Sequence, residues 1–155
     1  MNKNFIVRQA VISDAKDIYY INKTSLGYDY DLEKQKGKIE AVLNDSTQVI
    51  FVAETNNKVV GYIHLVNYDV IYADNFKNCL GLAVDNDYKR NGIGSALLNQ
   101  AEIWAKEKGN FICLEPWEGR TDDHEFAGTI DEKIGATALE AGESRKMQYS
   151  MEFHK

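Results

Sequence analysis

The alternation of hydrophobic and polar residues predicts five strands in the first 117 residues of the chain. The second and third of these strands are separated only by the turn Thr55-Asn56-Asn57-Lys58, which predicts a hairpin. The fourth is short, apolar and followed by Asp85-Asn86-Asp87, as expected of a buried strand. The predicted strands are residues 4–10, 48–54, 59–66, 79–84 and 111–115.

Three other stretches have apolar residues three and four positions apart, the spacing of a helix with one buried face. Ser13-Asp14 is placed to cap the first of these helices, and Asp31 is placed to cap the second, which reaches Asn44. The third ends where Gly109 would stop a helix. Its apolar positions are Ile93, Ala96, Leu97, Ala101, Trp104 and Ala105.

The segment between the fourth strand and the third helix has the chemistry of an anion-binding loop. The first turn of a helix leaves backbone N–H groups unpaired and carries a partial positive charge, so phosphates bind there readily. Gly92 and Gly94 let a diphosphate approach the backbone, and Lys89 and Arg90 add positive charge. A plain tight turn is the alternative. The P-loop and dinucleotide-binding patterns both fail, because the lysine of the first and the third glycine of the second are missing.

The run Val84-x-x-x-Tyr88-Lys89-Arg90-Asn91-Gly92-Ile93-Gly94-Ser95-x-Leu97-Leu98 resembles the acetyl-CoA-binding motif of the GNAT superfamily of N-acetyltransferases. The family pattern is Arg/Gln-x-x-Gly-x-Gly/Ala, and Lys89 stands at its first position. The resemblance implies an α/β (α+β) fold with a central mixed, mostly antiparallel sheet of six to seven strands flanked by about four helices. It also implies acetyl-CoA (coenzyme A) as cofactor. The implied cofactor-binding residues are Leu82, Ala83, Val84, Lys89, Arg90, Asn91, Gly92, Ile93, Gly94, Ser95, His124 and Phe126.

The implied reaction is attack of a neutral amine on the thioester carbonyl, which requires a base because amines are mostly protonated at pH 7. In the family a backbone N–H of the motif strand polarises the carbonyl, and a glutamate on that strand or its neighbour often takes the proton. Residues 80–84 hold no carboxylate. Glu115 is therefore the first candidate base and His64 the second; the alternatives are a solvated strand-end residue and a packed histidine.

The last third of the chain follows the family pattern only in part. Arg120, His124 and Phe126 fit it, but Ala127 replaces the tyrosine that often protonates the departing thiolate. Water or another tyrosine would then serve as the acid. The acidic run 122–125 also suggests a helix cap, and we predict no metal site there because adjacent helical residues point in different directions.

Two clusters of tyrosine and aspartate are candidates for the substrate-binding wall. Their charge would attract a cationic amine, although loop capping and ring packing explain them equally well. The resemblance is closest to bacterial aminoglycoside and polyamine-like acetyltransferases, which implies a small-molecule amine substrate that is aminoglycoside- or polyamine-like. Acetylation of a protein N-terminus or lysine and a non-catalytic acyl-CoA-binding module are the alternatives. The candidate residues in the two clusters are Tyr28, Asp29 and Tyr30, and Tyr68 and Tyr72.

Composition favours a single domain over residues 1–155, since 155 residues with 44% hydrophobic content suffice for a single core. The resemblance implies that this is an acetyltransferase domain. The net charge of −6 argues against nucleic acid as a partner. We expect a cytoplasmic protein without a membrane segment, because no apolar run reaches the ~18 residues of a span. Cys79 and Cys113 fit free thiols. The apolar-faced terminal strand 146–153 predicts a homodimer.

Overall fold

The computed structural model describes residues 4–108 and 112–113, all within one compact unit that ends at residue 114. Several predicted features lie outside these residues: Glu115 as base, His124 and Phe126 as cofactor ligands, Ala127, and the terminal strand 146–153. A single domain over the whole chain therefore stays a prediction.

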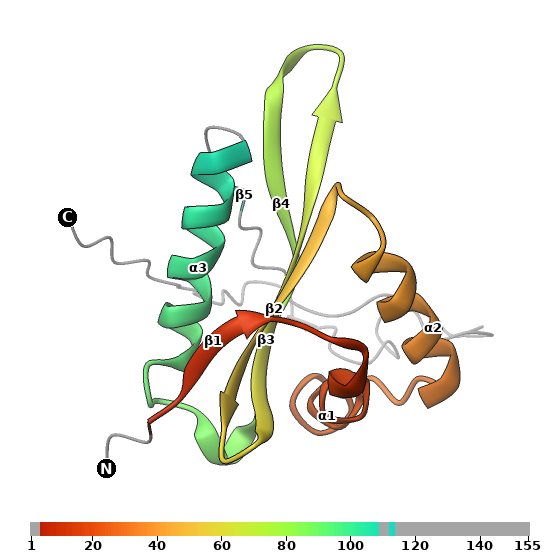
Figure 1. Ribbon diagram of the computed structural model, residues 1–155, viewed down its shortest axis with the longest axis vertical. Helices are drawn as coiled ribbons and strands as arrows, with labels where there is room; N and C mark the ends of the chain where they lie inside the picture. Colours follow the sequence, from red (N-terminus) through yellow and green to blue (C-terminus); the bar gives the residue numbers. More distant parts are fainter. Residues whose placement is uncertain (1–3, 109–111, 114–155) are drawn as a thin grey trace, which may run out of the picture. The chain divides into compact units, whose positions relative to one another are not determined.

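Five strands form one sheet in the order β1-β2-β3-β4-β5 (Figure 1). The first four run antiparallel to their neighbours, whereas β5 runs parallel to β4. This confirms the predicted mixed, mostly antiparallel sheet; the described part of the chain holds five of the expected six to seven strands. The strands are β1 Ile6–Gln9, β2 Gln48–Thr55, β3 Lys58–Val70, β4 Ala73–Val84 and β5 Ile112–Cys113.

Three α-helices lie among the described residues: α1 Ala15–Ile21, α2 Leu32–Leu43 and α3 Ile93–Lys108. Short turns extend α1 at both ends, namely the 3-10 helix η1 Ile12–Asp14 and the π-helical turn η2 Asn22–Leu26, and a second 3-10 helix, η3 Asn86–Tyr88, follows β4. The prediction for α2 is confirmed, because the Asp31 carboxylate accepts a hydrogen bond from the Lys34 amide at 2.8 Å.

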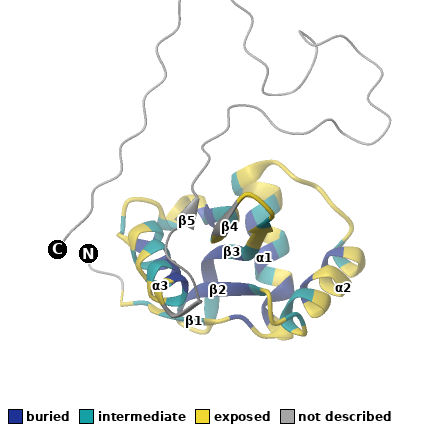
Figure 2. Ribbon diagram, turned by 90° about the horizontal axis from the view of Figure 1, so that it is seen from above, coloured by how far each residue is buried: buried dark blue, intermediate teal, exposed yellow. Residues whose placement is uncertain are grey.

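Helices α1 and α2 pack on one face of the sheet and α3 on the other (Figures 1 and 2). Strand β2 is buried on both faces, so its residues alternate between two cores rather than between core and solvent. Ile50 and Val52 face α1 and α2, while Phe51 and Ala53 face α3. The sheet is thus the middle of three layers. One face of β3 and β4 is turned toward α1 and α2, and the other face is turned toward α3.

The hairpin of β3 and β4 is longer than the sequence predicts. The strands were expected to end at residue 66 and to begin at residue 79, but pairing continues to Val70↔Ala73, leaving Ile71-Tyr72 as the loop (Figure 1). The polar residues in this stretch are compatible with a ribbon because its outer part is not covered on both faces. The register shifts between His64 and Leu65, so Leu80 of β4 has no opposite residue and forms a bulge.

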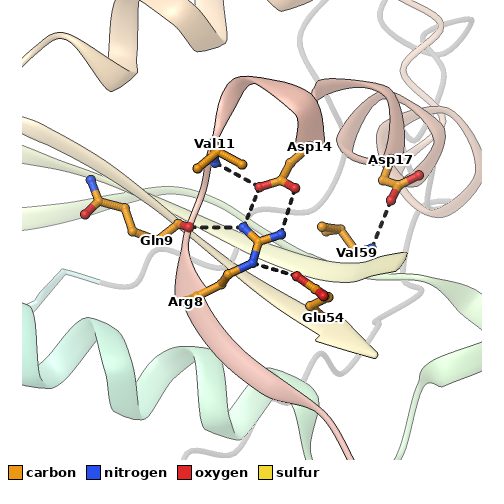
Figure 3. Close-up of polar contacts among 7 residues, drawn as sticks. All are labelled: Arg8, Gln9, Val11, Asp14, Asp17, Glu54 and Val59. Carbon is orange, nitrogen blue, oxygen red and sulfur yellow. Dashed lines mark hydrogen bonds and ion pairs between the residues drawn. The ribbon is translucent and has the colours of Figure 1, made fainter. Parts of the chain in front are cut away.

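Asp14 is the N-cap residue of α1, as predicted, but its side chain makes no hydrogen bond to the helix. Its carboxylate instead accepts from the Val11 amide at 2.8 Å and from two nitrogens of Arg8 at 2.7 and 2.9 Å (Figure 3). Arg8 also donates to Glu54 at 2.6 Å. A bidentate guanidinium partner outcompetes a helix amide for this buried carboxylate, and the network ties β1 to η1 and β2.

Candidate active site

The loop that joins β4 to α3 is held by its own side chains. Asp85 caps η3 by accepting from the Asp87 amide at 3.0 Å. The Asn91 side-chain amide donates to the carbonyl oxygens of Tyr88 and Lys89 at 3.0 and 3.1 Å. Asn91, predicted to bind the cofactor, therefore already has a structural role in shaping the loop.

The backbone of this loop turns twice through the left-handed region, at Arg90 with φ 61° and at Gly92 with φ 79°. Such turns bring successive N–H groups to one side and create an anion-binding concavity. Lys89 and Arg90 are both exposed beside it. The loop therefore combines turned backbone amides with two cations, as the sequence predicts.

The amide groups that open α3 are available to a ligand. The first helical hydrogen bond runs from the Ala96 amide to the Gly92 carbonyl at 3.0 Å. The amides of Ile93, Gly94 and Ser95 precede it and find no acceptor in the part of the chain that the structure describes. A Cβ atom added at Gly94 would meet no atom within 4 Å, so open space lies beside the backbone there. These features fit the phosphates of acetyl-CoA.

Gly61 of β3 sets the position of α3. A Cβ atom at Gly61 would lie 3.0 Å from Ile93 Cγ2, 3.1 Å from the Ala83 carbonyl oxygen and 3.3 Å from Leu97 Cδ1. Ile93 and Leu97 are the first two buried residues of α3. The missing side chain thus lets the N-terminal turn of α3 approach the sheet next to the end of β4. The sequence analysis did not identify Gly61, because only the tertiary contact gives it a role.

The predicted carbonyl-polarising segment, Leu82 to Val84, is the end of β4, paired with residues 61–63 of β3. On the other edge of β4, described pairing with β5 involves only Lys77 and Asn78. The segment that the sequence assigns to the thioester therefore lies beyond the described β4–β5 ladder and immediately before the anion-binding loop.

His64 lies on β3, on the face covered by α1 and α2, directly opposite Gly81 of β4. Its Nε2 is 3.0 Å from the Gln48 side-chain oxygen. When Nε2 carries the proton it donates to that oxygen, and Nδ1 then holds a free lone pair. Burial lowers the pKa of His64 below its usual value, so the ring is neutral at pH 7 and able to take a proton.

The predicted amine-binding residues lie on two elements. Asp29 is already paired with Lys23 at 2.9 Å and accepts from the Tyr19 hydroxyl at 3.0 Å, so an incoming ammonium group would compete with Lys23. Tyr30 lies under the Lys38 ammonium group, 5.8 Å from its ring centre. In the hairpin, Tyr68 packs on Phe76 with ring centres 4.8 Å apart, and Tyr72 at the tip is 82% exposed.

A buried polar chain that the sequence analysis missed connects the sheet to the helices. The Tyr62 hydroxyl donates to the Asn22 side-chain oxygen at 2.5 Å, and the Asn22 amide donates to Gln35 at 3.1 Å. Gln35 in turn donates to the Ala15 carbonyl oxygen at 3.4 Å. A tyrosine on the core face of a strand needs a partner for its hydroxyl, which is the one signal that could have pointed to this chain.

A hydrogen bond also joins η2 to η3, at the start of the loop between β4 and α3. The Asn86 side chain donates to the Thr24 carbonyl oxygen at 2.9 Å.

Within the described residues, no group of three His, Cys, Asp or Glu side chains is placed to hold a metal ion. No helix in the same part of the chain is long and apolar enough to cross a membrane.

Comparison with known proteins identifies the family. The sequence profile of the Acetyltransferase (GNAT) family matches residues 9–127, and the chain belongs to this family. The match runs from Gln9, the last residue of β1, past β5 and includes the loop that joins β4 to α3. No curated protein sequence matches the chain.

Solved structures with the same fold include three acetyltransferases. An aminoglycoside acetyltransferase from an uncultured soil metagenomic sample is 20% identical, with 72% of this chain and 77% of that chain covered and a TM-score of 0.61. Glucosamine-6-phosphate N-acetyltransferase from Arabidopsis thaliana is 15% identical, with 74% and 83% covered and a TM-score of 0.64. The enzyme AAC(6')-Iy, solved with a bisubstrate CoA analogue, is 13% identical, with 74% and 80% covered and a TM-score of 0.65. These similarities confirm the predicted fold class.

Proposed function

We propose that the protein is an acetyl-CoA-dependent N-acetyltransferase that acetylates the primary amine of a small molecule, with an aminoglycoside- or polyamine-like substrate. The observation that carries this proposal is the row of amides at Ile93, Gly94 and Ser95, which have no acceptor among the described residues and lie beside open space and two exposed cations. The activities of the aminoglycoside and glucosamine-6-phosphate acetyltransferases that share the fold support an amine substrate.

Different residues would bind the cofactor, polarise the thioester and take the proton. The amides that open α3, with Lys89 and Arg90, would hold the phosphates of the cofactor, which supplies the acetyl group as a thioester. A backbone N–H of Leu82 to Val84 would polarise the thioester carbonyl. Among the described residues His64 is the candidate base, because it is neutral and its Nδ1 is available when Nε2 donates to Gln48. Glu115 stays a prediction.

Binding and transfer are measured separately to test this proposal. We expect calorimetry to detect acetyl-CoA binding, and thiol release to depend on an amine from a panel of aminoglycosides, polyamines and peptides. Gly92→Glu should weaken binding by more than tenfold, because it places a carboxylate at the phosphate site and a side chain at φ 79°. Gly37→Ala is the matched control, since a Cβ atom added at Gly37 would meet no atom within 4 Å beyond its chain neighbours and its own helix backbone.

Each alternative gives a different result in the same assays. Tight cofactor binding without transfer to any amine would identify an acyl-CoA-binding module. Transfer to peptide N-termini or lysines alone would identify a protein acetyltransferase. Unchanged binding by Gly92→Glu, or no binding by the parent protein, would contradict the proposed phosphate site.

We further expect a cytoplasmic homodimer in which residues 146–153 form the contact. Sedimentation of the full chain at micromolar concentration checks the oligomeric state. A monomer under these conditions would contradict the predicted contact, while leaving the proposed reaction intact.

A further inference from the structure

The Tyr62 side chain lies over Gly81 of β4. A Cβ atom added at Gly81 would meet two atoms within 4 Å, and both belong to Tyr62: the hydroxyl oxygen at 3.6 Å and Cε2 at 3.7 Å. Gly81 follows the bulge residue Leu80. Bulges often occur next to active sites, where they redirect a strand. The hydroxyl of Tyr62 thus faces the strand along which the thioester is expected to lie, just before the segment 82–84.

The hydroxyl proton of Tyr62 has a fixed direction. It is donated to the Asn22 oxygen at 2.5 Å, and the Asn22 amide is in turn fixed by Gln35. The phenolic oxygen therefore presents its lone pairs, rather than its proton, to a further group. Burial, with smaller effects of Tyr28 and Cys79, raises the pKa of Tyr62 to about 12. The phenol consequently stays neutral at physiological pH and serves as a hydrogen-bond acceptor.

His64 lies on β3 beside the same glycine. It is directly opposite Gly81 in the β3–β4 register and two residues from Tyr62 on the same strand, so both side chains are on one face. Tyr62 is 8% exposed, and His64 is half-buried. Two hydrogen-bonding groups of different chemistry thus lie on β3, on the face where Gly81 of β4 has no side chain of its own.

We propose that Tyr62 orients the amine substrate above Gly81 by accepting one of its N–H groups, while His64 receives the other. This inference rests on the proposed acetyl transfer. The nitrogen lone pair attacks the acetyl carbonyl, the C–N bond forms and the C–S bond breaks. The proton lost by nitrogen goes to His64, and the coenzyme leaves as a thiolate that takes a proton from water. A neutral primary amine has the two N–H groups that this arrangement requires, whereas a secondary amine has one. The site should therefore favour primary amines.

Tyr62→Phe tests the role of the hydroxyl. We expect kcat/KM for a primary amine to fall about tenfold, the size of one or two hydrogen bonds. The ratio of kcat/KM between a primary amine and its N-methyl counterpart should fall as well, because only the primary amine loses a contact. Binding of acetyl-CoA should stay unchanged in calorimetry. Tyr20→Phe is the matched control, since it removes the hydroxyl of a tyrosine that is 48% exposed.

Gly81→Ala tests the same space without removing a buried polar group. The new methyl group would lie at ordinary contact distance from Tyr62, and Gly81 does not have a positive φ, so the fold should be retained. The methyl group would take up part of the space between Gly81 and the Tyr62 hydroxyl, next to the position proposed for the amine. We expect KM for the primary amine to rise at least tenfold with unchanged acetyl-CoA binding, while Gly37→Ala behaves like the parent.

The outcomes separate this inference from the proposed function. A parent protein that transfers acetyl to no amine would overturn both. A parent protein that acetylates amines, with Tyr62→Phe and Gly81→Ala showing parental KM and parental preference for primary amines, would overturn only the role of Tyr62. An equal loss of kcat/KM for primary and secondary amines would assign Tyr62 a structural role and also overturn it.

Discussion

Lys58, the first residue of β3, donates from Nζ to the Asp85 carboxylate at 3.0 Å, and Asp85 is 3% exposed. The other carboxylate oxygen of Asp85 accepts from the Asp87 amide. Its backbone amide donates to the Val60 carbonyl oxygen at 2.9 Å. One buried carboxylate thus fixes the point at which the chain leaves β4 and enters the anion-binding loop.

Asp85→Ala should damage both folding and cofactor binding. We expect the free energy of unfolding to fall by about 1–3 kcal/mol, because the Asp87 amide and the Lys58 ammonium group lose their partner. Acetyl-CoA binding should weaken because the loop loses its anchor. Urea unfolding and calorimetry measure the two effects.

Lys23→Met is the control for Asp85→Ala. It removes an ion pair whose partners are both largely exposed, and water replaces such a pair readily. We expect stability close to that of the parent. An Asp85→Ala variant with parental stability and parental affinity for acetyl-CoA would show that Asp85 does not anchor the loop.

Gly61→Ala should displace the N-terminal turn of α3. Its Cβ atom would lie 3.0 Å from Ile93 Cγ2 and 3.1 Å from the Ala83 carbonyl oxygen, and a backbone oxygen cannot move aside cheaply. Overpacking of this kind typically costs about 1–3 kcal/mol. We expect lower stability and weaker acetyl-CoA binding, with Gly37→Ala as control. Parental affinity for acetyl-CoA would mean that α3 can be displaced without changing the geometry of the amides proposed to bind the cofactor.

The parts of the fold that could be predicted from sequence are those with local signals. Asp31 caps α2 across three residues. Asn56 and Asn57 both have positive φ, 51° and 58°, which is the conformation that an Asn-Asn hairpin turn favours. The loop 89–95 was identified because its glycines and cations are adjacent in the sequence. In each case the interacting residues lie within a few positions of one another.

The parts that could not be predicted depend on residues far apart in the sequence. Tyr62 and Asn22 are 40 positions apart, and Arg8 and Glu54 are 46 apart. Asp14 has the residue type and position of a helix cap, but its carboxylate pairs with Arg8 instead of bonding to an amide of α1. Gly61 reads as an ordinary strand glycine until α3 is packed against it. Tertiary contacts override local preference at each of these positions.

The Arg8–Asp14 pair predicts sensitivity to acid. Burial alone would raise the pKa of Asp14, but the hydrogen bonds from Arg8 and the Val11 amide outweigh it, and the pKa lies below its usual value. The unfolded chain therefore binds a proton more readily than the folded one. The stabilisation is complete above the ordinary aspartate pKa of about 3.9 and is lost as pH falls through the lower folded value.

Arg8→Met should remove this acid dependence and destabilise the protein at neutral pH. The loss should be on the order of 3 kcal/mol, because the buried Asp14 carboxylate keeps its charge without its main partner. Thermal or urea unfolding between pH 3 and 7 measures both effects. The double variant Arg8→Met/Asp14→Asn should recover part of the stability, and no recovery would contradict the assignment to the ion pair.

The lowered pKa of His64 predicts a pH dependence of both activity and stability. Burial disfavours the charged ring, so the folded protein binds this proton less readily than the unfolded chain. Stability should rise with pH through a window just below the ordinary histidine pKa of about 6.5, and the contribution should be complete above it. Within the same window, kcat/KM should fall more steeply with decreasing pH than protonation of the amine alone explains, since both the base and the nucleophile are then lost.

His64→Gln should remove the additional slope and lower kcat, because a glutamine cannot take the proton from the amine. Gln48→Leu is the matched control, since it keeps the imidazole but removes the partner 3.0 Å from Nε2. We expect this variant to lose activity through poorer orientation of the ring while retaining the additional slope below pH 6.5. A His64→Gln variant whose pH–rate profile keeps that slope would transfer the role of base to another residue, and Glu115→Gln would then be the next variant to measure.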